Sequence, residues 1–370
     1  MNGEIALGLM SGTSADGVSA ALVQFKAHTY KLIGTAHADY PDEVVARIRA
    51  GGDLPTRELS ALNVQIGEVF AQAANKVLKK THTTPEHVAC IGSHGQTIYH
   101  GPTDSPRNTL QIGDPAVIAE RTGIAVVSHF RQRDVAAGGE GAPLMPFFDK
   151  YFFGTGPVRA MQNIGGIGNV TVVGRGVEKP LAFDTGPGNG LMDAAMRVIT
   201  GGAEQYDNHG ARAKKGRLSI EAVEKMIKND YFRRPPPKST GLEMFGAAFL
   251  QDNVGELLRE RPDDAMASLN YFTCLTIQES YRRFVFPQHQ VEEIVVSGGG
   301  AHNRTLMKKL ECLFAPIPVL SIEDLGLPAQ AKEPVAFAFF GLRALHGKIN
   351  HLPAATGAAH ARVLGSVTRP

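Results

Sequence analysis

The chain has 370 residues, of which 43% are hydrophobic and 20% charged, and its formal net charge is +2. This length and composition fit an ordered protein with room for two domains of ordinary size. The small net charge excludes the strong basic excess of a nucleic-acid-binding protein. Three widely spaced cysteines exclude a zinc cluster and suit a reducing compartment.

The chain begins without a basic leader followed by an apolar region, which argues against a secretion signal. No stretch approaches the ~20 apolar residues that a membrane helix needs. We therefore expect a cytoplasmic protein with neither a membrane nor a nucleic acid as partner.

The first predicted elements are two apolar strands joined by a turn of small residues at 11–17. The turn offers backbone N–H groups and the hydroxyls of Thr13 and Ser14 to an anion, and the Asp16 carboxylate to a cation. The phosphates and magnesium of a nucleotide require these groups. A plain turn-forming role for Asp16 is the alternative.

Strands and helices then alternate, which indicates an α/β architecture. Apolar residues recur at helical spacing from Leu59 to Val77, and Thr56 after Pro55 is expected to cap that helix. In chain order we then expect a buried strand over 88–92, a helix started by Asp114 and Pro115, and a strand over 124–127 whose exit loop holds Arg131, Arg133 and Asp134.

The segment 136–146 is rich in glycine and proline, and we interpret it as the passage between two lobes. Residues 161–173 then repeat the order strand, glycine-rich turn, strand, which predicts a second domain on a related plan. The remaining expected elements are a strand leading to Asp184, a mostly helical stretch over 219–286, a strand over 293–297, a helix from 304 and a last helix from Glu333 to 345.

Glycine-rich turns after strands are the main functional signal, because the chain lacks a P-loop, an H-E-x-x-H motif, a C-x-x-C motif and a nucleophile elbow. One such turn is adequately explained as a structural turn. Four recur, at 11–17, 165–169, 184–190 and 298–303. Their number favours the binding of a phosphorylated ligand.

Several polar residues at predicted strand and helix ends are candidates for chemistry. We expect Asp184 to be the catalytic base, with an Asx turn as the structural alternative. His94 and Gln96 are either ligand contacts or structural residues. The pair Arg131 and Arg133 either anchors a carboxylate or lies in a solvated loop.

Many motifs together resemble the anhydro-N-acetylmuramic acid kinase family, in the family's order and over nearly the whole chain. They are Gly8-Leu-Met-Ser-Gly-Thr-Ser-Ala-Asp-Gly17, Gly92-Ser-His-Gly-Gln-Thr97, Gln111-Ile-Gly113, Phe130-Arg-Gln-Arg-Asp134, Gly141-Ala-Pro-Leu144, Asn163-Ile-Gly-Gly-Ile-Gly-Asn169, Phe183-Asp-Thr-Gly-Pro-Gly-Asn189, Pro237-Lys-Ser-Thr-Gly241, Gly298-Gly-Gly-Ala-His-Asn303, Thr356-Gly-Ala358 and Leu364-Gly365.

The resemblance implies the fold of the actin, sugar-kinase and heat-shock ATPase superfamily. This is a two-lobed, ribonuclease H-like α/β fold with mixed sheets flanked by helices and ATP in the interlobe cleft. We expect the lobes at 1–140 and 141–370, with the last helix free to pack back on the first lobe. A homodimer is expected from the resemblance alone.

The implied reaction uses ATP and water to open the 1,6-anhydro bridge of anhydro-N-acetylmuramic acid and to phosphorylate O6. The product is N-acetylmuramic acid 6-phosphate, within peptidoglycan recycling. The resemblance makes Asp184 the general base, and Glu333 a helper at the reacting centre that could otherwise be explained as a helix cap. Asp16 would hold Mg²⁺ through water.

With the resemblance, we assign the remaining contacts to ATP and to the sugar. The expected ATP-binding residues are Gly12, Thr13, Ser14, Ala15, Asp16, Gly17, Val18, Ser19, Gly165, Gly166, Gly168, Asn169, Gly298, Gly299, Gly300 and Asn303. The expected sugar-binding residues are His94, Gln96, Arg131, Arg133, Asp134, Gly186 and Asn189.

The chain departs from the family pattern at three positions. Ser19 stands where aspartate is usual, Leu242 where arginine or lysine is usual, and Pro334 where alanine or glycine is usual. The first departure bears on how magnesium is held. Alternative functions are a kinase of another anhydrosugar such as levoglucosan, a non-catalytic ATP-binding sensor, and an acyl or acetate kinase of the same superfamily.

Overall fold

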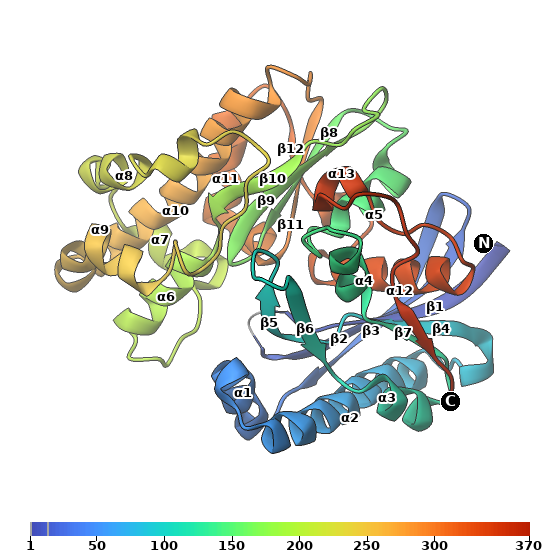
Figure 1. Cartoon of the computed structure of the whole chain (residues 1–370). Helices are drawn as coiled ribbons and strands as arrows, with labels where there is room; N and C mark the ends of the chain where they lie inside the picture. The colour runs from blue at the N-terminus through green and yellow to red at the C-terminus, as the bar shows by residue number, and fades with distance from the viewer. Residues whose placement is uncertain (1, 13–14) are drawn as a thin grey trace. The chain divides into compact units, whose positions relative to one another are not determined.

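The computed structural model describes residues 2–12 and 15–370, and the chain in it divides into two units. The first unit runs to residue 152 and includes 331–370, and the second unit is 153–330. The chain thus leaves the first unit twelve residues after the boundary expected at 140 and returns to it with its last helices. Each unit is described below by itself (Figure 1).

A six-stranded mixed sheet forms the centre of the first unit, in the order β13-β7-β4-β1-β2-β3. β1, β2 and β3 are antiparallel neighbours, while β4 and β7 continue the sheet in parallel with β1. The strands are β1 (Asn2–Met10), β2 (Gly17–Lys26), β3 (Thr29–Asp39), β4 (Val88–Ser93), β7 (Val126–Ser128) and β13 (Ser366–Thr368).

Helices cover both faces of this sheet. Leu7 and Leu9 of β1 belong to a buried apolar cluster that includes the inward side of α2 (Thr56–Thr81), on which α3 (Pro115–Thr122) packs. On the opposite face α12 (Lys332–Leu345) contacts β1 and β4, where Gly8 and Gly92 leave room for its backbone. A side chain at either glycine would overlap a carbonyl oxygen of α12.

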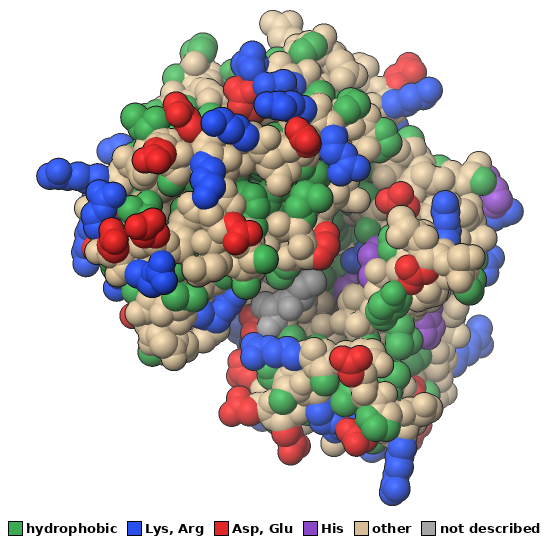
Figure 2. Space-filling view, turned by 60° about the vertical axis from the view of Figure 1, so that its left-hand side comes forward, with side chains coloured by type: hydrophobic (Ala, Val, Ile, Leu, Met, Phe, Trp, Pro, Cys, Tyr) green, Lys and Arg blue, Asp and Glu red, His purple; other side chains and the backbone are tan. Residues whose placement is uncertain are grey.

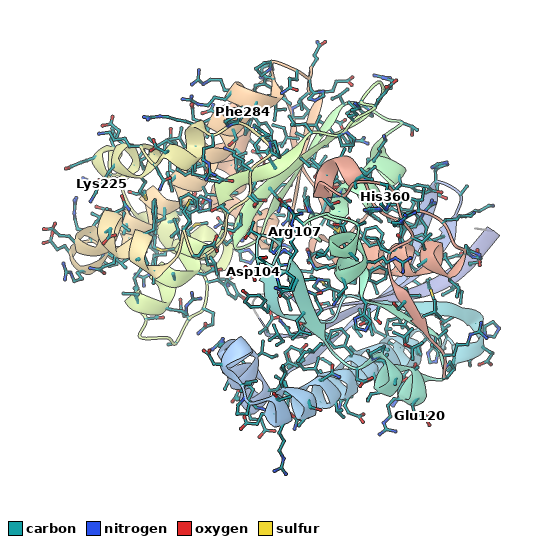
Figure 3. The ribbon with its side chains drawn as sticks, viewed as in Figure 1. Asp104, Arg107, Glu120, Lys225, Phe284 and His360 are labelled. Atoms are coloured by element: carbon teal, nitrogen blue, oxygen red, sulfur yellow. The ribbon has the colours of Figure 1, made fainter. Side chains whose placement is uncertain are left out.

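Shorter elements complete the first unit. The turn that carries Asp104 and Arg107 joins β5 to β6 (Figure 3). These elements are β5 (Gln96–Gly101), β6 (Asn108–Ile112), α1 (Asp42–Ala50), α4 (Phe130–Ala136), α5 (Met145–Phe153) and α13 (Pro353–Thr356).

Two local predictions in this unit are wrong. The exit loop expected after the strand at 124–127 is the helix α4, which follows His129 in the left-handed conformation. Residues two apart on a helix point in different directions, so Arg131 is half-buried while Arg133 is exposed. Thr56 is the first residue of α2 rather than its cap, because Pro55 takes the cap position.

The second unit contains a five-stranded mixed sheet in the order β10-β9-β8-β11-β12. Its first three strands are antiparallel, and β11 and β12 extend the sheet in parallel with β8. This is the strand plan of β3-β2-β1-β4-β7, as the repeated strand, turn, strand pattern predicts. The strands are β8 (Arg159–Ile164), β9 (Ile167–Val173), β10 (Ala182–Pro187), β11 (Glu293–Ser297) and β12 (Val319–Ser321).

The core of the second unit lies between this sheet and its helices. α10 is almost wholly buried and packs on α6, α7, α8, α9, α11 and β10. A five-residue π-helical turn, Tyr281–Val285, continues it. The helices are α6 (Gly190–Ile199), α7 (Ala211–Lys215), α8 (Ile220–Ile227), α9 (Ala247–Glu260), α10 (Pro262–Ser280) and α11 (Arg304–Phe314).

The predicted architecture of mixed sheets flanked by helices is confirmed in both units. On the face drawn in Figure 2, the basic and acidic side chains of the described residues are interspersed. No helix within 2–12 and 15–370 is both long enough and apolar enough to span a lipid bilayer.

Candidate functional site

In the second unit Asp184 lies in the edge strand β10, where the register shifts between Asp184 and Gly186. Its side chain is half-buried, and its Oδ2 accepts a hydrogen bond of 3.0 Å from the Thr240 backbone N–H. Burial is the main reason why the pKa of Asp184 rises to about 6, although the Thr240 N–H and the charge of Lys238 lower it. A carboxyl group with this pKa is ionised at neutral pH and can accept a proton.

A row of polar side chains continues from Asp184 across the sheet. Asp184 is opposite Asn169 of β9, Asn169 is opposite Asn163 of β8, and Asn163 is opposite Ser297 of β11. Directly paired residues share a face of a sheet, so the four side chains lie in line. The register therefore presents one amide, that of Asn169, directly beside the candidate base and a second, that of Asn163, one strand further on.

The glycine-rich turn between β8 and β9 is held against the start of α6. The N–H groups of Gly188 and Gly190 donate to the Gly166 carbonyl, and the Asn189 N–H donates to the Gly165 carbonyl. Gly166 faces open space, since a Cβ placed there would meet no atom within 4 Å. A backbone exposed in this way can approach a phosphate group closely.

Four other glycines at these turns are explained by close packing. A Cβ on Gly168 would lie 2.8 Å from the Thr185 Oγ1, and one on Gly186 would lie 2.8 Å from the Phe232 ring. Gly298 has a φ of +79° and, like Gly300, packs on the end of β8. These contacts bring the turn after β11 next to the turn after β8.

Two of the three expected asparagine contacts of this unit have structural partners. Asn303 caps α11 by accepting from the Leu306 N–H at 3.0 Å. Asn189 precedes α6 and donates to the Ile164 carbonyl at 3.1 Å. Both side chains therefore hold strand and helix ends in place around the glycine turns.

In the first unit the turn between β1 and β2 includes Thr13 and Ser14, which lie outside the described residues. Its start is held by Ser11, whose Oγ is 2.8 Å from the Gly17 carbonyl and 2.6 Å from the Gln96 Oε1. Gln96 is 1% exposed, so its side chain supports the start of the turn from the interior of the first unit.

The remaining expected nucleotide contacts of this turn differ in exposure. Asp16 is exposed, whereas the side chains of Ala15 and Val18 are buried and leave only their backbone for a ligand. Ser19 lies on β2, with its Oγ 3.2 Å from the His37 Nδ1.

His94 and Arg131 form a second cluster in the first unit. The Arg131 Nε donates to the His94 Nε2 at 3.0 Å, and its Nη1 donates to the Gly141 carbonyl at 2.9 Å. The His94 ring therefore carries its proton on Nδ1, which donates to the Gly95 carbonyl at 2.8 Å. Burial and then the charge of Arg131 lower the pKa of His94 to about 3, so this imidazole is neutral and orients the guanidinium.

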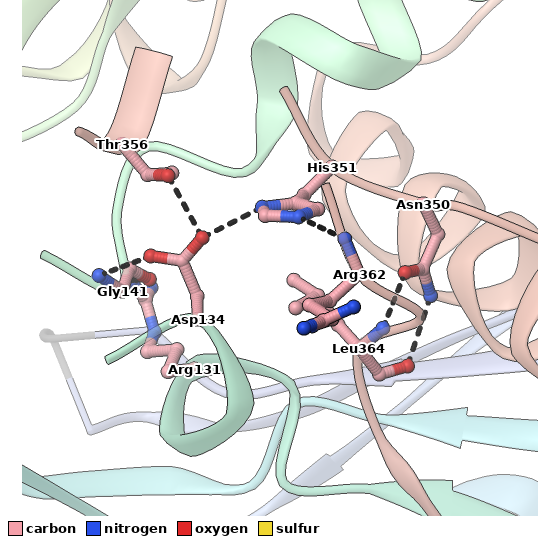
Figure 4. Close-up of polar contacts among 8 residues, drawn as sticks. All are labelled: Arg131, Asp134, Gly141, Asn350, His351, Thr356, Arg362 and Leu364. Carbon is pink, nitrogen blue, oxygen red and sulfur yellow. Dashed lines mark hydrogen bonds and ion pairs between the residues drawn. The ribbon is translucent and has the colours of Figure 1, made fainter. Parts of the chain in front are cut away.

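Asp134 is fully buried and binds the C-terminal segment instead of facing solvent (Figure 4). Its Oδ1 accepts from the His351 Nδ1 and the Thr356 hydroxyl, each at 2.7 Å, and its Oδ2 accepts from the Gly141 N–H at 2.8 Å. Both oxygens are thus occupied by the protein. We infer that Asp134 positions α4 and the turn at Gly141, and so Arg131, rather than contacting a ligand.

Glu333 lies exposed in the first turn of α12. Burial lowers the pKa of the Arg131 guanidinium, and the negative charges of Glu333 and Asp134 counteract this. The neighbour of Glu333, Lys332, forms a buried ion pair of 2.9 Å with Asp149 of α5. This pair and the glycine contacts of α12 fix the place of Glu333 in the first unit.

The structure thus assembles two groups of expected site residues. In the first unit His94 and Arg131 are hydrogen-bonded, and the negative charge of Glu333 acts on the Arg131 guanidinium. In the second it joins Asp184, Asn169 and the glycine turns. Sequence reasoning did not assign Asn163, Lys238 and Thr240, although the motifs 163–169 and 237–241 contained them.

A half-buried strand carboxylate in the same sheet as glycine-rich turns fits the class of enzymes that use a general base and bind an anion. The family model for anhydro-N-acetylmuramic acid kinase matches residues 4–370, and the chain belongs to that family. The family resemblance inferred from the sequence motifs is therefore confirmed.

The chain is also similar to named relatives over nearly its whole length. The anhydro-N-acetylmuramic acid kinase of Caldanaerobacter subterraneus is 41% identical, with 98% of this chain and 96% of the relative covered. That of Streptomyces coelicolor is also 41% identical, with 98% and 93% covered.

Solved structures show more distant similarity. Component A of the (R)-2-hydroxyglutaryl-CoA dehydratase of Acidaminococcus fermentans matches with a TM-score of 0.49 and 14% identity, covering 93% of this chain and 99% of that one. A ROK family glucokinase of Streptomyces griseus, in complex with glucose and AMPPNP, matches with a TM-score of 0.40 and 12% identity, covering 92% and 99%.

Proposed function

We propose that this protein is an ATP-dependent kinase that opens the 1,6-anhydro ring of anhydro-N-acetylmuramic acid with water and phosphorylates O6. The products are N-acetylmuramic acid 6-phosphate and ADP, formed in peptidoglycan recycling. The observation that carries the proposal is the family match over residues 4–370. A cytoplasmic location and a homodimer remain predictions from the sequence.

In this reaction Asp184 is the general base. It takes a proton from a water molecule that attacks the anomeric carbon, and the released bridge oxygen attacks the γ-phosphate. The half-buried position of Asp184 and its pKa of about 6 support this role. At neutral pH the carboxyl group is ionised, and its pKa is close enough to neutrality for it to accept a proton efficiently. Asn169, directly opposite in the sheet, is placed to orient the water.

The glycine turns are assigned to the phosphates of ATP. The open backbone at Gly166 fits a group that needs N–H donors and little steric hindrance. The turn at 11–17 is assigned to the phosphates from its sequence. Within 2–12 and 15–370 no cluster of three or more His, Cys, Asp or Glu residues could hold a metal by itself. Exposed Asp16 fits Mg²⁺, which binds through one or two carboxylates, waters and phosphates and would neutralise phosphate charge.

Arg131 is assigned to the sugar's carboxylate. Its Nε and Nη1 are bonded to His94 and Gly141, so the guanidinium has a fixed direction, and within residues 2–12 and 15–370 its Nη2 is left for a ligand. Levoglucosan has no carboxylate, so it would gain nothing from this guanidinium. The arginine thus favours anhydro-N-acetylmuramic acid over the alternative sugar.

ADP release, measured with anhydro-N-acetylmuramic acid, with levoglucosan and without sugar, tests the proposal. We expect activity with the first substrate and at most slow turnover of the others. Activity with levoglucosan alone would support the alternative kinase, and nucleotide binding without any turnover would support the sensor.

Asp184→Asn tests the role of the base. The variant should lose turnover by about 10³-fold or more while it still binds ATP, because the amide cannot accept a proton. Asp193→Asn is the matched control, since Asp193 is also half-buried in the second unit and its pKa is also raised by burial to about 6. Near-normal activity of Asp184→Asn would show that another group is the base.

A further inference from the structure

Lys238 is a buried cation held by aromatic rings. The residue is 9% exposed, and its Nζ lies 4.6 Å from the ring centre of Tyr231, 4.9 Å from that of Phe284 and 5.7 Å from that of Phe183. Phe284 belongs to the π-helical turn after α10 (Figure 3). The Nζ donates to the Tyr231 carbonyl at 3.3 Å, and no ion pair joins it to a carboxylate of the described residues.

The segment 238–240 and Tyr231 also bind Asp184, at the unpaired edge of β10. The Asp184 N–H donates to the Lys238 carbonyl at 3.1 Å, and the Thr240 N–H donates to the Asp184 Oδ2. The Tyr231 hydroxyl donates to the Asp184 carbonyl at 2.6 Å. The segment 238–240 thus ties Lys238 to the candidate base through backbone hydrogen bonds, while the Lys238 ammonium lies among the aromatic rings and makes no direct contact with the carboxylate.

We propose that Lys238 is a positioning residue that keeps Asp184 ionised and correctly oriented for proton abstraction. This inference rests on the proposed function. The aromatic rings take the place of a carboxylate partner, because the negative face of a ring attracts a cation without neutralising it. The ammonium can therefore act on Asp184 without contacting it, and no donor among the described residues occupies the Asp184 Oδ1, which can accept from the water.

The charges around the pair agree with this role. Burial, followed by Arg234 and Arg283, lowers the pKa of Lys238 to about 8, and Asp184 counteracts this. Burial raises the pKa of Asp184 to about 6, Thr240 and Lys238 lower it, and Glu243 raises it. Between these values the lysine is protonated and the aspartate is ionised, which is the pair of states that the proposal needs.

Lys238→Met keeps most of the length of the side chain and removes the charge. We expect the acid limb of kcat/KM to move up by roughly one pH unit, the lower end of the shift produced by a nearby opposite charge. At pH 6 the ionised fraction of Asp184 would fall from about one half to about one tenth, a loss of about fivefold. At pH 8.5 kcat/KM should stay within about twofold of wild type, because Asp184 is ionised in both proteins.

Two further variants serve as controls. Lys238→Arg retains the charge and should keep the acid limb near pH 6. Lys309 is a control in the same unit, since burial also lowers its pKa and its Nζ lies 5.9 Å from the centre of the Tyr271 ring. Lys309→Met should leave the acid limb unchanged.

A direct titration of the Asp184 carboxyl carbon by NMR makes the test independent of activity, with Asp184→Asn to assign the signal. An upward shift in folded Lys238→Met supports the inference. Equal loss of kcat/KM at every pH, or an unmoved Asp184 titration, would overturn it. A wild-type enzyme that is inactive on the anhydrosugar would refute the proposed function alone, because the titration would still report the coupling.

Discussion

Replacing Asp134 by asparagine should destabilise the first unit strongly, because the carboxylate is fully buried and accepts three hydrogen bonds. An asparagine can still offer one oxygen to His351 and Thr356. Its NH₂ group then faces the Gly141 N–H, so that a buried acceptor is replaced by a donor. In the flipped orientation the NH₂ faces His351 and Thr356 instead.

The magnitude follows from the bonds that are lost. A hydrogen bond to a charged group contributes about 1.5–3 kcal/mol, and a buried unsatisfied donor costs about 1–3 kcal/mol. One lost bond and one unsatisfied N–H therefore predict a loss of about 3–5 kcal/mol in the free energy of unfolding. Thr356→Val, which removes a single donor and leaves the carboxylate in place, should cost only about 1–2 kcal/mol.

Urea unfolding followed by circular dichroism measures the loss, and hydrogen exchange localises it. Amides of α4 and of 350–364 should lose protection in Asp134→Asn, while those of the second unit should not. The KM for the anhydrosugar should rise, because Arg131 is carried by α4. A loss below about 1 kcal/mol, or unchanged exchange in 350–364, would refute the reasoning about this network.

The same network predicts a pH dependence. Burial raises the pKa of Asp134, but the hydrogen bonds from His351, Thr356 and Gly141 outweigh it, and the net pKa lies below the ordinary 3.8. When the pKa of a carboxyl group is lower in the folded state than in the unfolded state, its charged form stabilises the folded protein. This contribution is complete above the unfolded pKa and is lost as the pH falls through the folded pKa. The difference in stability between wild type and Asp134→Asn should therefore shrink below pH 3.8.

Two further changes test how α12 is held. Gly92→Ala would push a methyl group into the Phe337 carbonyl of α12 and should cost about 3 kcal/mol or more in urea unfolding, whereas Gly52→Ala, which faces open space, should cost less than about 1 kcal/mol. Lys332→Met leaves the Asp149 carboxylate buried without its partner and should cost about 3–5 kcal/mol. Adding Asp149→Leu should restore most of that stability, and a double variant as unstable as the single one would contradict the ion-pair argument.

Several local elements could be read from the sequence because their signals are contained in a few neighbouring residues. Asp114 caps α3 through the Ala116 N–H, as the Asp-Pro pair predicts. The strand expected over 293–297 and the helix expected from 304 have those starts in the structure. Apolar periodicity and capping act over one or two turns, so tertiary contacts are not needed to recognise them.

Other features depend on partners far away in the chain. α4 has only seven residues and a weak local signal, and it is tied by Asp134 to residues more than 200 positions later. Arg131 and Arg133 were therefore expected as a pair on a loop, although the helix separates them. The return of α12 to the first unit likewise depends on its contacts with Gly8 and Gly92.

The sequence by itself determined the family, the α/β architecture with its repeated hairpins, and the choice of Asp184 as the candidate base, because these follow from local patterns and contiguous motifs. Only the tertiary structure decided which groups surround that base. The row through Asn169 and the aromatic cage of Lys238 arise from strand register and side-chain packing, which join residues distant in sequence. Burial in turn sets the pKa values of Asp184, Lys238 and His94, and no local sequence pattern contains that information.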